Sequence, residues 1–280
     1  RSCGKSIRCP HCDVTLSLHK DGSLRCHYCG YRIPMPKNCP SCGSPYISGF
    51  RAGTQQIEKV LEKDFPEARV LRMDFDTTRT KDSYEKILAS FSRHEADILV
   101  GTQMIVKGHD FPDVTLVGVI AADLSLNMDD YHCGERTFQL LTQAVGRAGR
   151  GAKPGRAVIQ TYQPEHYSIQ AAATQDYGKF YKEEMSYRML MDYPPAAHMM
   201  TVFGACQDEE LLKKAMYYIE VFIRRVSPKE ELHMIGPAAA SVGKVKDVYR
   251  QVLHLKHVDM AFLTAVREKL EQYIEINSGF

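Results

Sequence analysis

Cysteines are crowded at the start of this 280-residue chain, and their spacing restricts what the first 47 residues can fold into. Three complete Cys-x-x-Cys pairs begin at Cys9, Cys26 and Cys39. Two of them are followed by glycine, which lets the backbone turn and direct its amides at thiolate sulfur. Cys3 is followed by glycine in the same way, so we expect a fourth pair whose first cysteine lies upstream of Arg1.

Cysteine pairs at this spacing favour structural zinc and a reducing compartment over disulfides. Because structural zinc takes four ligands, eight thiolates make two sites. The spacing predicts that the two inner pairs share one ion, while the outer pair shares the second ion with Cys3 and a ligand upstream of residue 1. Free buried thiols are the alternative. The predicted metal ligands are Cys3, Cys9, Cys12, Cys26, Cys29, Cys39 and Cys42.

Composition excludes few functions. With 44% hydrophobic and 25% charged residues, the chain is typical of globular proteins and long enough for about two domains. The formal net charge of +2 does not indicate nucleic-acid binding by itself, so any basic surface must be local. The sequence has no apolar run of about 18 residues, and we expect no transmembrane helix.

The middle of the chain alternates apolar strand-like runs with helical patterns. Strands are predicted at 98–100, 116–121 and 157–161, and a helix at 135–145. Alternation of this kind predicts a mostly parallel sheet covered by helices. Functional loops in such sheets follow the carboxyl ends of strands. The loops predicted here are 53–55, 101–110 and 123–134.

The last part of the chain predicts an α+β domain. Its strands are expected at 200–206, 232–235, 248–255 and 274–276, and its helices at 209–226 and 260–273. The order β-α-β-β-α-β suggests a ferredoxin-like, split βαβ layer. We therefore divide the chain into a zinc-binding module, an α/β lobe and an α+β domain, with bounds 1–47, 48–190 and 191–280.

Gln143, Arg147 and Arg150 lie about one turn apart at the predicted end of a helix, and both arginines belong to the run GRAGR at 146–150. Arginine offers a rigid charged fork to phosphate oxygens. A glutamine and two arginines placed there suit binding of a nucleotide γ-phosphate and stabilisation of charge during its transfer. The alternative is a solvated basic helix end.

These residues carry a family resemblance. Residues 101–112, GTQMIVKGHDFP, resemble motif V of superfamily 2 helicases, and residues 143–150 resemble motif VI. Gly53, Thr54 and Gln55 resemble the sequence near motif IV. Together with the segment 122–143 and the paired cysteine knuckles, the whole chain resembles the primosomal replication-restart DNA helicases, the PriA family or primosomal protein N′.

The resemblance implies a second RecA-like helicase lobe flanked by the zinc module and a C-terminal domain that binds DNA or partners. The sequence contains no GxxxxGK[ST] phosphate loop and no Asp-Glu pair suited to magnesium. In the family, an N-terminal lobe carries both. ATP and magnesium are therefore expected only with that missing lobe, and these 280 residues alone are expected to be inactive.

Roles follow from the resemblance. Arg150 is expected to be the arginine finger and Arg147 a second γ-phosphate contact, while Gln143 orients or senses the phosphate. Gly108 and Asp110 are assigned to the nucleotide site. Asp110 is expected either to contact the ribose of the nucleotide or to couple the nucleotide site to DNA. The expected DNA contacts are Thr54, Gly101, Thr102, Lys246 and Arg250.

As the family does, the full protein is expected to translocate 3′ to 5′, restart stalled replication forks and initiate primosome assembly in bacteria. Its expected partners are forked and single-stranded DNA, the single-stranded-DNA-binding protein and primosome proteins. We expect a cytoplasmic, nucleoid-associated monomer. A double-stranded DNA translocase, or a zinc-ribbon DNA-binding module with an inactive helicase lobe, are the alternatives.

Overall fold

The computed structural model describes residues 3–19, 21–47, 53–75, 77–78, 81–106, 111–227 and 232–277. Contacts between Cα atoms divide the chain into two compact units. One unit joins Arg1–Gly49 to Met185–Phe280, and the other is Phe50–Glu184. The first and last parts of the chain thus belong to one compact unit. The division into 1–47, 48–190 and 191–280 stays a prediction.

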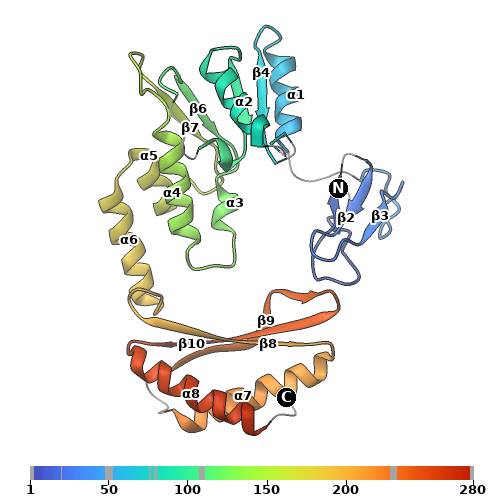
Figure 1. The fold of residues 1–280 in the computed structure, drawn as a ribbon, viewed down its shortest axis with the longest axis vertical. Coiled ribbons are helices and arrows are strands. Elements are labelled where there is room, and N and C mark those ends of the chain that lie inside the picture. The colour runs from blue at the N-terminus through green and yellow to red at the C-terminus, as the bar shows by residue number, and fades with distance from the viewer. Residues whose placement is uncertain are drawn as a thin grey trace. The chain divides into compact units, whose positions relative to one another are not determined.

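The cysteine-rich segment contains three very short strands, β1 (Ser17–Leu18), β2 (Ser23–Arg25) and β3 (Arg32–Pro34). They form an antiparallel sheet in the order β1-β2-β3 (Figure 1). Leu24 is the one large aliphatic side chain buried among the described residues before residue 48. Strands this short with so small an apolar core supply little folding free energy.

Unit Phe50–Glu184 alternates helices and strands, as the sequence predicts. Its elements in chain order are α1 (Thr54–Asp64), β4 (Val70–Met73), α2 (Lys81–Ser92), β5 (Ile98–Gly101), the 3₁₀ turn η1 (Gln103–Ile105), β6 (Leu116–Val119), α3 (Asp123–Leu126), α4 (Cys133–Val145), β7 (Arg156–Ile159), α5 (Tyr167–Thr174) and α6 (Tyr177–Leu190), the last of which continues past Glu184. The sequence did not predict α5.

The parallel character of this unit is confirmed. In the described residues, β4 pairs with β5 and β6 pairs with β7, each in parallel register (Figure 1).

The core of the same unit forms where α4 packs on α5 and α6. Phe138 stacks on Phe180 with ring centroids 4.1 Å apart. Leu141 and Ile169 are buried beside them. This packing fixes the position of α4, whose last residue, Val145, precedes the arginine run.

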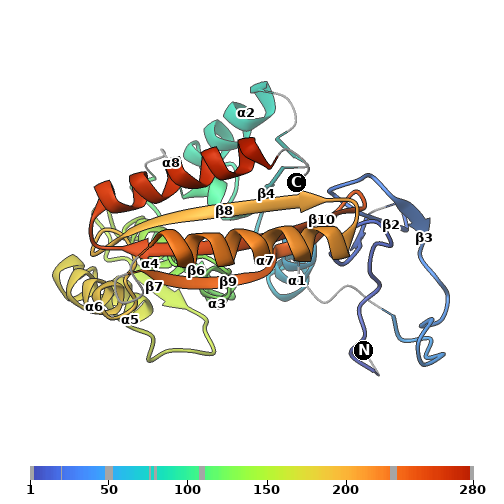
Figure 2. The ribbon, with the colours of Figure 1, turned by 90° about the horizontal axis from the view of Figure 1, so that it is seen from below.

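The C-terminal part contains β8 (His198–Cys206), α7 (Glu209–Val226), β9 (His233–Val245), β10 (Val248–His257) and α8 (Met260–Ile276). Its strands form an antiparallel sheet in the order β8-β10-β9. Both helices cover the same face of that sheet (Figures 1 and 2). The core between them and the sheet includes Leu253 and Leu255, both fully buried.

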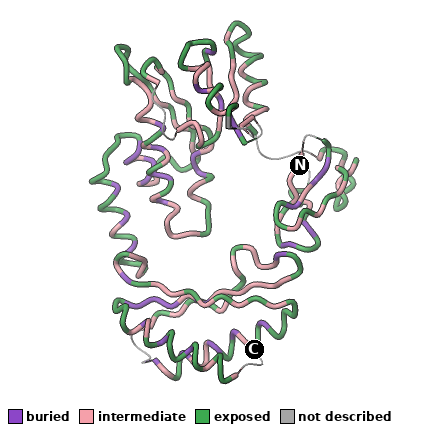
Figure 3. The backbone as a smooth tube through the Cα atoms, in the orientation of Figure 1, coloured by how far each residue is buried: buried purple, intermediate pink, exposed green. Residues whose placement is uncertain are grey.

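Helix α7 begins and packs where the sequence predicts. The Asp208 carboxylate accepts hydrogen bonds from the amides of Glu210 and Leu211, which caps the first turn. Buried and exposed residues alternate along α7 and α8 (Figure 3). The buried residues of α7 follow the apolar period of a helix and form its core face: Leu212, Met216, Ile219 and Ile223.

The predicted strand at 274–276 is wrong, because these residues form the last turn of α8. The Tyr273 ring stacks on Phe222 of α7 with centroids 4.1 Å apart, which anchors the helix end. The observed order is therefore β-α-β-β-α with three strands. β9 is also longer than predicted, since it passes Gly236 through a shift in register instead of ending there.

None of the helices in the described ranges is long and apolar enough to cross a membrane.

Candidate functional site

The seven N-terminal cysteines gather into the same two groups that the sequence predicts to share ions. The inner cysteine group consists of Cys9, Cys12, Cys26 and Cys29, whose sulfur atoms all lie within 4.8 Å of one another. The first three are buried. Tetrahedral metal coordination by four thiolates requires this kind of convergence.

Tight turns aim backbone amides into this group. Gly30 follows the second knuckle with a φ of 81°, a left-handed conformation that glycine adopts without strain. The Gly30 amide donates to the carbonyl of Cys26 at 3.0 Å. The Tyr31 amide donates to Cys29 Sγ at 3.4 Å. The backbone is therefore wound around the sulfur atoms as the glycine pattern predicts.

The outer cysteine group consists of Cys3, Cys39 and Cys42, again with sulfur atoms within 4.8 Å of one another. Cys3 Sγ lies 3.7 Å from Cys39 Sγ. Gly43 repeats the glycine turn with a φ of 70°. This group is more exposed than the inner one and offers three cysteines among the described residues.

The thiols of both groups are electrostatically suited to a cation. Burial raises the pKa of Cys12 to about 12, so its thiolate needs a positive partner. Burial also raises the pKa of Cys26, but the amides of Cys29 and Tyr28 more than offset this effect and hold it at about 7. The amides of Ser41 and Cys42 lower the pKa of Cys39 to about 7. All seven cysteines are free of disulfides, so the donor set fits zinc.

The arginine run lies in a turn just beyond α4. Gly146 follows the helix, and the Arg147 amide donates to the carbonyl of Ala144 at 3.0 Å. The Arg147 side chain is partly buried and donates through Nη2 to the carbonyl of Val106 at 2.8 Å. Arg147 thereby ties the end of α4 to the segment that follows β5 and η1.

The two outer members of the predicted set are exposed. Gln143 lies on the exposed side of α4. The exposed Arg150 side chain folds back so that Nε donates to the carbonyl of Gly146 at 2.7 Å. The arginines are thus held in one turn, with Arg147 anchored and Arg150 facing solvent in this unit.

Glycine is required at Gly149 in that turn. Its φ is 75°, and a Cβ there would lie 2.5 Å from the amide nitrogen of Gly155. The Gly149 amide also donates to the carbonyl of Val114 at 2.9 Å, just before β6. This close backbone approach places the turn beside the start of the β6–β7 pair.

Residues predicted to contact DNA gather where β4 and β5 end. Gly101 is the last residue of β5 and pairs with Met73, the last of β4. Exposed Thr102 follows Gly101, and its hydroxyl makes no helix-capping bond. Thr54 begins α1 and donates through Oγ1 to Asp74 Oδ2 at 2.6 Å, one residue beyond β4. Gly101, Thr102 and Thr54 therefore share one edge of the strand pair.

Asp74 was not singled out from the sequence. Asp74 is buried, and its carboxylate also accepts hydrogen bonds from Arg72 Nη1 at 2.9 Å and from the Thr77 amide. It fixes the Thr54 hydroxyl, so a DNA contact by Thr54 would form around a hydroxyl already held in place. A lone Asp after a short strand carries no spacing signal, and sequence reasoning had no means to find it.

Gly108 and Asp110, which we assigned to the nucleotide, lie outside the described residues.

Lys246 and Arg250 lie on the β9–β10 hairpin of the C-terminal part. Lys246 is exposed at the two-residue turn, and Arg250 lies on β10 opposite Ala205 of β8. Tyr249, which lies between them in sequence, is partly buried against the core of the domain. The two cations therefore lack an exposed aromatic neighbour at that position.

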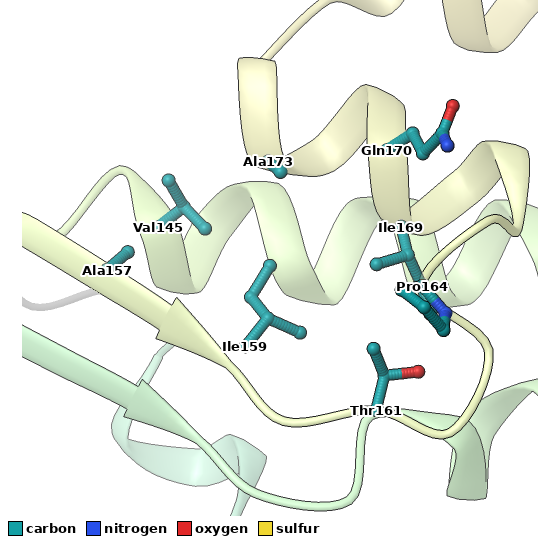
Figure 4. Close-up of a pocket in the computed structure, with 8 residues that line it drawn as sticks. All are labelled: Val145, Ala157, Ile159, Thr161, Pro164, Ile169, Gln170 and Ala173. Carbon is teal, nitrogen blue, oxygen red and sulfur yellow. The ribbon is translucent and has the colours of Figure 1, made fainter.

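A shallow depression of about 310 Å³ lies beside the C-terminal end of α4 (Figure 4). Val145, Ile159 and Ile169 point into it, and no residue that lines it is charged. Because a triphosphate needs cationic partners, this depression is not the nucleotide site.

Two domain families match the chain. Residues 9–34 match the PriA DNA helicase Cys-rich region (CRR) domain. Residues 46–152 match the Helicase conserved C-terminal domain. The fold and these matches define a helicase-type RecA-like lobe preceded by a cysteine-rich zinc ribbon.

Curated relatives show more specifically which helicase-type proteins the chain resembles. The chain is 45% identical over 276 residues to the replication restart protein PriA of Bacillus subtilis. The aligned region covers 98% of this chain and 34% of the relative. It is 43% identical to the PriA of Synechocystis over 97% of this chain and 33% of the relative. For the PriA of Thermotoga maritima, identity is 36% over 98% of this chain and 36% of the relative.

The chain is therefore similar to the PriA replication restart proteins along nearly its whole length. It spans about a third of the length of these relatives.

The close backbone contact at Gly149 allows a test of the geometry of residues 146–150, here called the arginine turn. We expect Gly149→Ala to lower the free energy of unfolding of unit Phe50–Glu184 by more than about 1 kcal/mol, because alanine is strained at this φ and its Cβ meets backbone. Gly118→Ala on β6 is the matched control, since a Cβ there meets nothing within 4 Å. Urea unfolding curves that coincide for the two variants would contradict the assigned geometry.

Proposed function

We propose that this chain supplies the second lobe, the zinc module and the C-terminal domain of an ATP-dependent DNA helicase that restarts stalled replication forks. The observation that carries the proposal is the arginine turn, in which Arg147 is anchored to Val106 and Arg150 is presented at the surface. The phosphate loop and magnesium ligands come from a separate lobe of the full protein. ATP lies between the two lobes, so this chain contributes half of the hydrolytic site.

Arg150 acts as the arginine finger that stabilises charge on the transferred phosphoryl group. Arg147 holds the turn through Val106 and makes the second contact with the γ-phosphate. Gln143, one turn earlier on the exposed side of α4, senses the phosphate. Gly108 and Asp110 belong to the nucleotide side, where Asp110 contacts the ribose or couples the site to DNA.

The DNA track follows the carboxyl ends of β4 and β5. Gly101 and Thr102 bind a DNA phosphate through a backbone amide and a hydroxyl, and Thr54 binds on the other side of the track. Such contacts position a strand without specifying its sequence, as a motor requires. Lys246 and Arg250 add phosphate contacts from the C-terminal domain.

The inner and outer cysteine groups each hold a zinc ion, which cross-links the knuckles. The ligands are Cys9, Cys12, Cys26 and Cys29 at the inner site, and Cys3, Cys39, Cys42 and one further ligand at the outer site.

The full protein moves 3′ to 5′ as a monomer in the bacterial cytoplasm, associated with the nucleoid. It engages forked and single-stranded DNA, the single-stranded-DNA-binding protein and primosome proteins. A double-stranded translocase of the same superfamily would share the arginine turn, and strand displacement on forked DNA separates the two. A zinc-ribbon module with an inactive helicase lobe would not need Arg147 and Arg150 together with Gln143.

The 280-residue chain alone is expected to show no ATP hydrolysis, with or without single-stranded DNA, because it lacks a phosphate loop. A coupled phosphate-release assay on the purified chain measures this. DNA-stimulated turnover by these residues would refute the division of the site between two lobes.

In the protein that includes the first lobe, Arg150→Ala is expected to lower the rate of ATP hydrolysis by about 10³-fold or more, the effect of losing an arginine finger. Single-stranded DNA binding, measured by fluorescence anisotropy, is expected to be unchanged. Arg156→Ala, an exposed arginine at the start of β7, serves as the charge-matched control. Near-normal turnover of Arg150→Ala would remove its assigned role.

The chain is expected to release zinc in two steps during titration with a chelator. The outer group should lose its ion first, because it is more exposed than the inner group. The described residues also supply three cysteines there, whereas zinc takes four ligands. Cys42→Ser should abolish the first step and Cys26→Ser the second. A single step, or release that neither variant alters, would contradict two separate sites.

A further inference from the structure

The hairpin turn between β9 and β10 lies directly against the first cysteine knuckle. The Asp247 amide donates to the carbonyl of His11 at 2.9 Å, and the Asp13 amide donates to the carbonyl of Lys244 at 2.8 Å. Lys244 Nζ also donates to the carbonyl of Pro10 at 2.9 Å. Segments more than 230 residues apart in sequence therefore pair through their main chains.

One hydrogen bond reaches a predicted metal ligand. The Lys246 amide donates to Cys12 Sγ at 3.3 Å. Cys12 is 1% exposed, so this bond forms away from water. An amide directed at a thiolate stabilises its negative charge, which is the role of outer-sphere hydrogen bonds at metal sites.

The turn also closes the inner cysteine group with an apolar side chain. Val245, 7% exposed, belongs to the same buried cluster as Cys9, Cys12 and Cys26. Burying it there excludes water from one side of the sulfur atoms. The C-terminal domain thus contributes one of the apolar side chains, Val245, that cover the inner cysteine group.

The conformation of the turn is consistent with a constraint at this place. Lys246 and Asp247 have φ angles of 53° and 61°, the left-handed region that two-residue hairpin turns require and that asparagine and glycine occupy most easily. Neither residue is glycine, so the turn costs conformational energy. The amide bonds to Cys12 and His11, and the contact of Asp247 Oδ2 with His11 Nδ1 at 2.7 Å, offset that cost.

We infer that the β9–β10 turn is a built part of the inner metal site, with the Lys246 amide and the Val245 side chain as positioning groups for the Cys12 ligand. The inference rests on the proposed binding of zinc by the inner cysteine group. It predicts a reciprocal coupling: the hairpin strengthens metal binding, and the metal orders the hairpin turn.

Metal affinity tests the first direction. In a Cys42→Ser background that removes the outer site, Val245→Ser is expected to weaken zinc binding by the inner group about 10–100-fold, the usual effect of losing outer-shell support. Affinity is measured by competition with a chromogenic chelator. His233→Ala, at the opposite end of β9, is the matched control and should leave affinity unchanged.

A second variant separates the amide from the side chain. Lys246→Gly keeps the N–H group and tolerates a positive φ, so zinc affinity should be retained although a charge is lost. An equal loss of affinity in Lys246→Gly and Val245→Ser would overturn the role of the amide. Unchanged affinity in Val245→Ser would overturn the inference as a whole.

Hydrogen exchange tests the reverse direction and does not depend on the stability of the hairpin variants. Cys26→Ser removes the inner metal but leaves Cys12 in place, and should speed exchange of the Lys246 and Asp247 amides. Cys42→Ser should not. Amides of Leu253 and Leu255, in the core of the C-terminal domain, should stay protected in both. Protection of Lys246 that is equal in the two variants would overturn the coupling.

Cadmium gives a direct signature. With ¹¹³Cd bound to the inner group, the Lys246 amide proton should show scalar coupling to the metal through Cys12 sulfur, and its absence would overturn the assigned hydrogen bond. If the inner group binds no metal at all, the proposed zinc site fails. If it binds metal without any effect of Val245→Ser, only the inference about the hairpin fails.

Discussion

The four sulfur atoms of the inner cysteine group lie within 4.8 Å of one another. This convergence organises the cysteine-rich part of the unit that joins Arg1–Gly49 to Met185–Phe280. The cysteine-rich segment has strands of two or three residues and one large buried aliphatic side chain among its described residues. So small a core does not offset the conformational entropy of ordering some forty residues. Metal–thiolate bonds at the proposed zinc sites would therefore supply most of the folding free energy of this segment. The β9–β10 turn packs on this segment through Val245 and the Lys246 amide.

The arginine turn follows a different principle, in which close backbone contact replaces a metal. Gly149 approaches Gly155 so closely that no side chain fits between them. Its amide bonds to Val114, and Arg147 reaches across to Val106. These contacts join the end of α4 to segments next to β5 and β6. A cationic group held by main-chain contacts keeps its position when a phosphate arrives, which is the preorganisation that transition-state stabilisation requires.

Local patterns were sufficient to predict much of this arrangement. The 3.6-residue apolar period gave the core face of α7, and the Asp208 cap explains its start. The Cys-x-x-Cys spacing and the glycines that follow it gave both sulfur groups. The strand at 274–276 was wrong because the β-branched residues Ile274 and Ile276 also occur at a helix end, and the stacking of Tyr273 on Phe222 favours the helix. The Asp74–Thr54 bond and the hairpin contact with Cys12 join residues far apart in sequence, and no local pattern encodes such partners.

The hairpin contact changes how the basic residues of the C-terminal domain should be understood. Lys246 was singled out as a cation, yet its main chain and its side chain have separate tasks. Its N–H group points to Cys12, whereas the residue as a whole is exposed. The ammonium group thus remains available to a DNA phosphate while the amide supports the ligand. A phosphate bound there would lie next to the inner cysteine group, so the zinc module and the C-terminal domain would meet DNA as one surface. Loss of the inner metal would then weaken DNA binding through Lys246 without altering its charge, a consequence that treating the two domains as independent modules does not predict.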